Sequence, residues 1–337
     1  MQGGKNMKFI DLHCATISAV YQNRLKGERA QLKENTGHID LMRLKKGECF
    51  GQNFALFTYL KNTGDPYAYA KELLHVYKSE MAANFDAIRP AAAVQEMLDN
   101  EKAGVMSGIL TLEEGAVCRG DTELLREFYR EGVRMMTLTW NFENELAWPN
   151  RMDMTTGRCV PETEHGLKPK GFEFVELMEE LGMAVDVSHL GDAGFWDVVQ
   201  AAKKPFLASH SNARAVASHV RNLTDEMIRA LSERGGVMGI NYCASFLNDE
   251  EQKQPGGGHS RIADMIRHIK HIRNVGGIDC IALGSDFDGI SGELEVSSPA
   301  ALSLLEAELY RQGFTEEEIE KIFWKNAFRF YREVWKA

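Results

Sequence analysis

The sequence predicts an α/β fold of the (β/α)8 TIM-barrel type, and three observations point to it. Short apolar runs, often β-branched, recur along the chain, and amphipathic or charged segments separate them. Eight such runs can be counted, as many as the barrel has strands. One domain, residues 1–337, is therefore expected, because barrels of this type with insertions reach beyond about 400 residues.

The expected strands and helices follow one another from the N-terminus. The strands are residues 8–13 (KFIDLH), 53–60 (NFALFTYL), 104–112 (GVMSGILTL), 133–139 (VRMMTLT), 183–189 (MAVDVSH), 205–210 (PFLASH), 236–242 (GVMGINY) and 280–286 (CIALGSD). Helical patterns lie between them, among others at residues 171–181, 192–202, 224–233 and 262–275. Thr224 and Thr315 precede acidic residues and an apolar periodicity, as helix N-caps do.

An open doubly wound sheet is the alternative fold. It would bring a glycine-rich phosphate-binding turn after the first strand, but the segment DLHCATISAV contains no glycine. Residues 1–6, which precede this strand, are treated as a ragged start and given no function.

The composition is that of an acidic globular protein. The 39 Lys and Arg residues against 49 Asp and Glu residues give a formal charge of −10, and 44% of the residues are hydrophobic. This excludes a disordered or collagen-like chain, and the acidity argues against nucleic-acid binding, which normally requires a basic face. Without a signal-peptide pattern or a window near 18 apolar residues, we expect a cytoplasmic protein with no membrane segment. Six cysteines without CxxC spacing indicate reduced thiols.

The ends of the expected strands are unusually polar. In such a barrel the active site lies at the carboxyl ends of the strands. The candidates there are Asp11, His13, Glu113, Glu114, Asp186, His189, His210, Asp286 and Asp288. Each alone is more often a structural residue or a helix cap, but their joint placement favours a metal centre. Imidazole and carboxylate bind zinc or a similar divalent ion without thiolates.

Glu113 favours two metal ions over one. A carboxylate can bridge two ions about 3.5 to 4 Å apart, which hold a hydroxide between them. Such a water, with its pKa lowered, is a nucleophile. The expected reaction class is hydrolysis, in which a carboxylate such as Asp286 takes the proton and returns it to the leaving group.

Segments from the first strand to the last helix carry a resemblance to a known family. They are IDLHCAT, TLEEG, GVRMMTLTWN, DVSH, SHSNAR, HVRNLTDEMIRAL, GGVMGIN, LGSDFDG and KNAFRF. In order and spacing they resemble the renal (membrane) dipeptidase family of zinc peptidases. The resemblance implies that Glu113 bridges two zinc ions, with His189 and His210 on one ion. The other ion would take His13 and the residue two places later.

The resemblance also implies how a substrate is bound. Asp286 would orient and deprotonate the bridging water, and Arg221 would clamp the C-terminal carboxylate of a dipeptide. A guanidinium suits that task because its fork makes two charge-assisted bonds to a carboxylate. The alternative is that Arg221 is a surface arginine in a loop. Trp140 and Tyr242 are further expected substrate contacts.

Ala15 departs from the family pattern. Where the family has His-x-Asp, this chain reads His13, Cys14, Ala15, so a carboxylate is missing and we expect the first zinc site to be weakened. Cys14 does not replace it, because neighbouring residues in an extended strand point to opposite faces. The sequence leaves open whether Ala15 is a natural divergence or an introduced change.

Trp140 is the second departure, because many family members carry a histidine there that contacts the substrate. An indole N–H cannot carry a positive charge, so oxyanion stabilisation would fall to the metal ions or another group. His165 is a candidate substitute, although a solvent-exposed loop residue is the favoured interpretation. Trp140, Phe142 and Trp148 either wall the pocket, limiting it to small side chains, or pack beneath a loop.

The leading hypothesis is a zinc-dependent dipeptidase that cleaves L,L and, by resemblance, L,D dipeptides. One alternative is a paralogue, marked by Ala15, that binds dipeptides or one metal with little turnover. Another is a metal-barrel hydrolase that acts on a different amide, a lactone or a phosphoester. The expected partner is a small dipeptide, with no nucleic acid and no membrane. The resemblance leaves a homodimer open.

Overall fold

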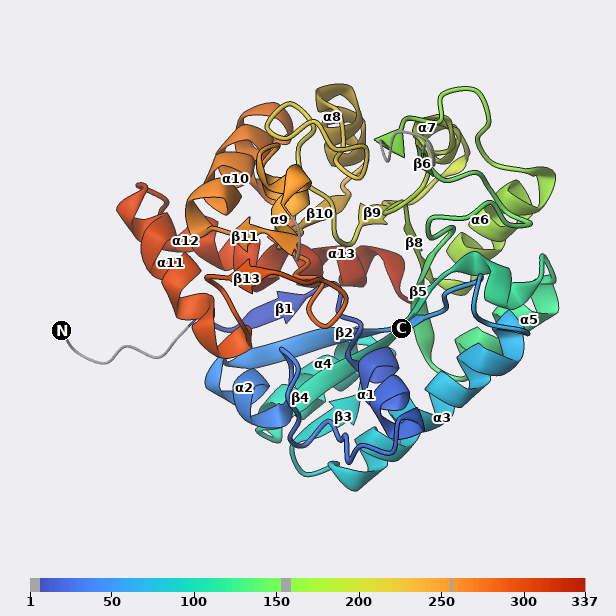
Figure 1. The fold of residues 1–337 in the computed structure, drawn as a ribbon, viewed down its shortest axis with the longest axis horizontal. Coiled ribbons are helices and arrows are strands. Elements are labelled where there is room, and N and C mark those ends of the chain that lie inside the picture. The colour runs from blue at the N-terminus through green and yellow to red at the C-terminus, as the bar shows by residue number, and fades with distance from the viewer. Residues whose placement is uncertain (1–6, 153–158, 255–256, 337) are drawn as a thin grey trace.

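Eight parallel strands close into a barrel in the computed structural model, which describes residues 7–152, 159–254 and 257–336 (Figure 1). The strands are β1 (Phe9–Asp11), β2 (Cys49–Phe57), β4 (Met106–Glu113), β5 (Val133–Thr137), β8 (Ala184–Asp186), β9 (Leu207–Ala208), β10 (Val237–Ile240) and β12 (Ile281–Leu283). Each pairs with the next along the chain, and β12 pairs with β1, so that the barrel is closed. Each of the eight predicted runs overlaps one barrel strand, and the predicted fold is confirmed.

The short strand β3 (Ile88–Pro90) was not predicted. It pairs with the first half of β4, on the edge that β5 joins from Leu110 onward. Three residues are too few to show a two-residue periodicity, so no pattern marks this strand. Two small ribbons lie outside the barrel, the antiparallel pair β6 (Arg151–Met152) with β7 (Cys159–Val160) and the parallel pair β11 (His259–Ser260) with β13 (Glu293–Leu294).

Helices surround the barrel (Figure 1). They are α1 (Thr16–Leu25), α2 (Leu41–Lys46), α3 (Pro66–Ala83), α4 (Val94–Lys102), α5 (Thr122–Arg130), α6 (Pro169–Leu181), α7 (Asp192–Ala201), α8 (Asp225–Glu233), α9 (Ala244–Leu247), α10 (Ile262–Gly276), α11 (Leu302–Arg311), α12 (Glu316–Glu320) and α13 (Asn326–Val334). Shorter turns are η1 (Gly115–Cys118), η2 (Glu251–Lys253), η4 (Ile278–Cys280), η5 (Pro299–Ala301) and the π-helical η6 (Lys321–Lys325). Both predicted N-caps are confirmed, because the Thr224 side chain accepts from the backbone N–H of Met227 and that of Thr315 from Glu318.

Helix α13 closes one end of the barrel. Its residues Phe330 and Tyr331 share a buried cluster with Phe50, Leu207 and Val237, which lie at or near the starts of their strands. Because this end is filled by apolar side chains, the opposite end, where the strands terminate, is the one available for chemistry. None of the helices in the described ranges is long and apolar enough to cross a membrane.

Candidate metal centre

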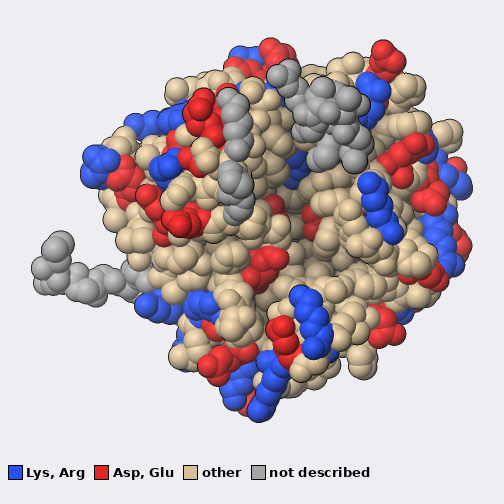
Figure 2. All heavy atoms as spheres, viewed as in Figure 1, with Lys and Arg blue, Asp and Glu red and all other residues tan. Residues whose placement is uncertain are grey.

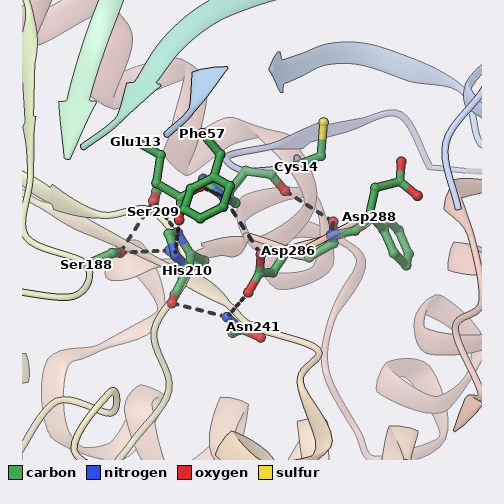
Figure 3. Close-up of polar contacts among 12 residues, drawn as sticks. Cys14, Phe57, Glu113, Ser188, Ser209, His210, Asn241, Asp286 and Asp288 are labelled. Atoms are coloured by element: carbon green, nitrogen blue, oxygen red, sulfur yellow. Dashed lines mark hydrogen bonds and ion pairs between the residues drawn. The ribbon is translucent and has the colours of Figure 1, made fainter. Parts of the chain in front are cut away.

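Five predicted residues meet at the carboxyl ends of the strands. Glu113 is the last residue of β4, and His13, His189, His210 and Asp286 follow β1, β8, β9 and β12 within three residues of each strand's end (Figure 3). Oε2 of Glu113 lies 3.2 Å from Nε2 of His13. Its Oε1 lies 3.3 Å from Nε2 of His189 and 3.7 Å from Nε2 of His210. The structure therefore gathers side chains from opposite ends of the sequence around one carboxylate.

The donor atoms of this cluster are arranged for a metal ion. Atoms of His13, Glu113 and His210 lie within 4.8 Å of one another, and all three residues are buried. His189 joins them, because its Nε2 is 2.9 Å from Nε2 of His210. Within the described part of the chain, neither ring nitrogen of His13 has a hydrogen-bond partner. A buried imidazole in that situation fits a ligand of a metal ion better than a packing residue.

The other nitrogen of each paired imidazole shows which atom faces the centre. Nδ1 of His189 lies 2.8 Å from Oδ1 of Asn141, and Nδ1 of His210 lies 2.7 Å from Oγ of Ser209. An amide oxygen only accepts, so Nδ1 of His189 carries a proton and the Nε2 of this neutral ring carries a lone pair. A second shell that leaves Nε2 free in this way is typical of metal-binding histidines.

The electrostatics of the centre favour a cation. Burial opposes the ionisation of Glu113, but the charge of His13 outweighs it and lowers the pKa of Glu113 to about 2. Conversely, burial would lower the pKa of His13, but the Glu113 charge raises it to about 9. Burial, aided by Arg221, lowers the pKa of His189 to about 3, and burial holds the pKa of His210 well below its usual value. The neutral imidazoles of His189 and His210 beside the ionised carboxylate of Glu113 are donors that zinc and similar ions bind.

Asp286 stands at the edge of this cluster. Its Oδ1 lies 3.8 Å from Nε2 of His13, and its Oδ2 accepts a hydrogen bond of 3.0 Å from Asn241. Burial raises the pKa of Asp286 to about 6. The residue has a left-handed backbone, with φ of 63°, which is uncommon outside glycine and occurs often at functional sites.

A cavity of about 340 Å³ opens onto the cluster and is lined by Glu113, His189, Asp286 and Arg221, among others. Figure 2 shows the face of the molecule hollowed near its centre. Arg221 is 7% exposed, so it is not the surface arginine of the alternative interpretation. One of its nitrogens donates to the carbonyl of His210 at 3.1 Å, whereas its buried Nε has no partner among the described residues. The guanidinium therefore has donor capacity left for a ligand in the cavity.

Ala15 lines the same cavity, where its methyl group offers no donor to a metal ion. The thiol of Cys14 donates instead to the carbonyl of Asn53 at 3.2 Å. Figure 3 shows its sulfur directed away from the cluster, as strand alternation predicts. Neither Ala15 nor Cys14 therefore supplies a ligand in place of the carboxylate expected at position 15.

The aromatic candidates separate into two groups. Trp140 lines the cavity, with its ring 5.1 Å from that of Phe57 and 5.8 Å from that of His189. Phe142 packs behind Trp140 at 5.5 Å, outside the described cavity wall. Trp148 lies against His165, at 5.0 Å, and does not reach the wall either.

His165 and Tyr242 lie away from the cavity wall as described. The His165 side chain is 55% exposed and pairs with Glu162, in keeping with the favoured interpretation of a loop residue. Tyr242 is fully buried and packs edge-to-face on Phe287, with ring centres 5.4 Å apart. Of the predicted substrate contacts, the structure therefore brings Arg221 and Trp140 to the cavity but not Tyr242.

Two other carboxylates at strand ends bind serines of the neighbouring strand instead of facing the centre. Asp11 accepts from the backbone N–H and the hydroxyl of Ser285, at 2.9 and 2.6 Å. Asp186 accepts from the same two groups of Ser209, also at 2.9 and 2.6 Å. Each pair fastens one strand end to the next, so these acids support the site without entering it.

Glu114 and Asp288 fasten loops. Glu114 accepts from the backbone N–H groups of Ala116 and Trp140, at 2.8 and 3.0 Å, and burial raises its pKa to about 7. Asp288 accepts from the backbone N–H of His38 at 2.5 Å, and thereby ties the loop after β12 to a segment near the N-terminus. Neither side chain lines the cavity.

Sequence reasoning missed Asn141 and Ser209, which orient the two paired imidazoles. For Ser209 a signal was present, because the dipeptide Ser-His occurs twice at strand ends, as Ser188-His189 and as Ser209-His210. No pattern of this kind marks Asn141, which lies in the loop after β5.

Comparison with known proteins places this chain in a family. The profile of the membrane dipeptidase family (peptidase family M19) matches residues 4–337. The chain belongs to the membrane dipeptidase family. An uncharacterised dipeptidase of Schizosaccharomyces pombe is 30% identical to it, over 98% of this chain and 80% of its own length. Dipeptidase tcpJ of Claviceps purpurea is 26% identical, over 94% of this chain and 74% of its own length.

Solved structures of membrane dipeptidase relatives share the whole fold. The dipeptidase AC, a metallopeptidase of family M19, is 25% identical, with a TM-score of 0.88 over 99% of this chain and 100% of its own. A metallopeptidase from Rhodobacter sphaeroides, solved with a phosphinate mimic of the dipeptide L-Ala-D-Ala, is 25% identical, with a TM-score of 0.87 over 98% and 100%. The resemblance seen in the sequence is confirmed, and this member of the family is a metallopeptidase of the hydrolase class with a buried metal-binding candidate.

Proposed function

We propose that the chain is a zinc-dependent dipeptidase, which hydrolyses the single peptide bond of dipeptides with a free C-terminal carboxylate. The observation that carries the proposal is that Arg221 lines the same cavity of about 340 Å³ as Glu113, His189 and Asp286. A carboxylate bound to Arg221 would be held inside this cavity together with the neighbouring peptide bond. A site of that size favours dipeptides over longer peptides.

The side chains divide the work between binding and proton transfer. Arg221 binds the substrate carboxylate through the donors that its protein partners leave free. Asp286, held by Asn241, takes the proton of the attacking water and returns it to the leaving amine. Divalent ions in the centre would supply polarisation of the scissile carbonyl and a water of lowered pKa.

Two unequal metal positions are part of this proposal. His189, His210 and Glu113 offer three protein ligands to one ion, the number usual in catalytic zinc sites. His13 and Glu113 offer two to the other ion, and Asp286 lies 3.8 Å from His13 as a third candidate. Because Ala15 adds no ligand, we expect the second ion to bind more weakly than the first.

Tolerance of a D-residue at the C-terminal position is the finer expectation. It is supported by the Rhodobacter sphaeroides relative, whose ligand is a mimic of L-Ala-D-Ala. The test is a panel of L,L and L,D dipeptides incubated with the zinc-loaded chain, each beside its C-terminal amide. Cleavage of the free acids with at least about 10-fold higher kcat/KM than of the amides supports the proposal.

Arg221→Met sharpens this test. The variant should lose roughly 10- to 150-fold in kcat/KM on free dipeptides, as expected for a charge-assisted hydrogen bond, and change little on the amides. If neither acids nor amides are cleaved although zinc binds, the dipeptidase proposal falls. A lactone or phosphoester hydrolase, or a binding protein with little turnover, then becomes the better reading of the same cavity.

A further inference from the structure

We propose that Ser209, backed by Asp186, is a positioning residue that fixes the tautomer and orientation of His210 and thereby tightens metal binding at the His189/His210 position. The inference rests on the proposed function only in that it concerns the same metal centre. Its evidence is a chain of hydrogen bonds beneath that centre, in which every member is fully buried.

Asp186 lies at the end of this series of hydrogen bonds that is farthest from the metal position. Its Oδ1 accepts from the backbone N–H groups of Ser188 and Ser209, at 3.0 and 2.9 Å. Its Oδ2 accepts from the hydroxyls of Thr137 and Ser209, at 2.7 and 2.6 Å. Four donors from three strand ends hold this carboxylate, so it is a rigid acceptor at the foot of the centre.

The proton count then decides the state of His210. A serine hydroxyl has one proton, and Ser209 gives it to Oδ2 of Asp186. The 2.7 Å contact between Oγ of Ser209 and Nδ1 of His210 must therefore be a bond in which the imidazole donates. His210 is thus protonated at Nδ1, and Nε2 of this neutral ring presents a lone pair to the metal position.

The backbone of His210 is held by hydrogen bonds as well. The N–H of His210 donates to Oγ of Ser188 at 3.1 Å, and its carbonyl accepts from Arg221 at 3.1 Å. Ring and backbone are therefore both held before an ion arrives. A ligand that needs no reorientation loses less entropy on binding a metal.

The chain contains a matched control in Ser285. This serine is also fully buried and precedes a site residue, and it donates to Asp11 at 2.6 Å, as Ser209 donates to Asp186. Its hydroxyl accepts from the backbone N–H of Phe287 and lies 3.3 Å from the backbone carbonyl of His13, but among the described residues it contacts no imidazole ring. Replacing Ser285 by alanine removes an equally buried hydroxyl from the same kind of pair, without touching a metal ligand's ring.

The experiment compares Ser209→Ala, Ser209→Cys and Ser285→Ala with the unaltered chain. Zinc affinity of the metal-free proteins is measured by competition with a chelator, and the tautomer of His210 by NMR of protein labelled with ¹⁵N-histidine. We expect both Ser209 variants to bind the first zinc equivalent 10- to 100-fold more weakly. We expect their His210 to lose the uniform Nδ1–H signature, while Ser285→Ala keeps both properties within about 3-fold.

Ser209→Cys retains the volume of the side chain, so it covers the case in which the alanine variant does not fold. Unchanged zinc affinity and an unchanged Nδ1–H signature in a folded Ser209 variant would overturn the proposal, as would an equal loss in Ser285→Ala. These readouts do not depend on peptide cleavage. A chain that cleaves no dipeptide can therefore still confirm the positioning role, and a dipeptidase can still refute it.

Discussion

The β8/β9 half of the metal centre contains His189 and His210, and its β1/β12 half contains His13, Ala15 and Asp286. A carboxylate–serine pair lies behind each half, Asp186 with Ser209 and Asp11 with Ser285, but the two halves hold their histidines differently. In the β8/β9 half, Asn141 and Ser209 each bind the outer nitrogen of an imidazole. In the β1/β12 half, His13 has no hydrogen-bond partner on either nitrogen among the described residues.

Because of this difference, only one half of the centre is preorganised by hydrogen bonds to its imidazoles. The β8/β9 half presents two lone pairs whose directions are set by second-shell hydrogen bonds. The β1/β12 half presents one imidazole, held by packing against His210 with ring centres 3.8 Å apart, and a methyl group at position 15. Glu113 belongs to both halves, because each of its oxygens faces a different one. We therefore expect a tight and a weak metal position that depend on a common carboxylate.

The largest effect is expected from Glu113→Gln, which removes the group that the halves share. An amide offers weaker metal ligation and no negative charge, so both metal equivalents should be lost on dialysis. Dipeptide cleavage should fall at least about 1,000-fold, or about 4 kcal/mol. Metal content measured by mass spectrometry and steady-state rates check this.

Glu114→Gln is the control for that change. Glu114 is the adjacent buried carboxylate, but it binds backbone N–H groups and does not line the cavity. Its variant should retain both metal equivalents. If Glu113→Gln retained one metal equivalent at full affinity, the two halves would bind their ions independently.

The next largest effect is expected from Ala15→Asp, which adds a carboxylate to the β1/β12 half, where the weaker metal position is expected. Zinc affinity of the second equivalent should rise, and dipeptide cleavage should rise about 100-fold, equivalent to about 2.7 kcal/mol. The first equivalent should keep its affinity, because His189 and His210 are unchanged. Comparable rates for both chains would show that the β1/β12 half works without this ligand.

The candidate ligands and the residues that support them differ in how far the sequence could predict them. The ends of the strands can be recognised in the sequence, because apolar runs stop there at polar residues. The sequence therefore predicts five site residues together, namely His13, Glu113, His189, His210 and Asp286. That they meet around Glu113 required the closure of β12 onto β1, which follows from the barrel once eight strands are assigned. The resemblance supplied roles that no periodicity shows.

The supporting residues could not be predicted in the same way. Asp11 and Asp186 carry the same polar signal as the ligands, and only the pairing of strand ends shows that each one meets a serine. Asn141 lies in a loop, whose path depends on tertiary contacts such as that of Glu114 with the N–H of Trp140. Hydrogen-bond partners distant in the chain leave no local pattern, so second-shell roles become visible only in the fold.

A smaller effect is expected from Trp140→Leu, which separates substrate binding from metal support. Trp140 forms an aromatic wall with Phe57 beside His189, but its indole is not a metal ligand. Loss of the aromatic surface should lower kcat/KM about 10-fold for dipeptides with an apolar N-terminal side chain, with zinc affinity unchanged. Trp148→Leu, outside the described cavity wall, is the matched control and should leave kcat/KM as it was. A parallel fall in zinc affinity for Trp140→Leu would place this ring among the supports of the β8/β9 half.

The smallest effect concerns His268 of α10, a buried imidazole that contrasts with His13 because the backbone satisfies both its nitrogens. Nδ1 accepts from the N–H of Ala213 at 3.1 Å, and Nε2 lies 3.0 Å from the carbonyl of Leu247. Burial lowers the pKa of His268 to about 4, from 6.5.

The sign of the resulting pH dependence follows from proton binding. The unfolded chain takes up a proton at this histidine below about pH 6.5, whereas the folded chain does so only near pH 4. The stabilisation is therefore complete above pH 6.5 and is lost as the pH falls toward 4. Between pH 7 and pH 6 this group should cost about 0.7 kcal/mol of unfolding free energy. The measurement is urea unfolding of the metal-free protein and of its His268→Gln variant, each at pH 7 and pH 6. The unaltered chain should lose about 0.7 kcal/mol more unfolding free energy between these pH values than the variant does. Equal losses would mean that backbone partners do not keep this imidazole neutral.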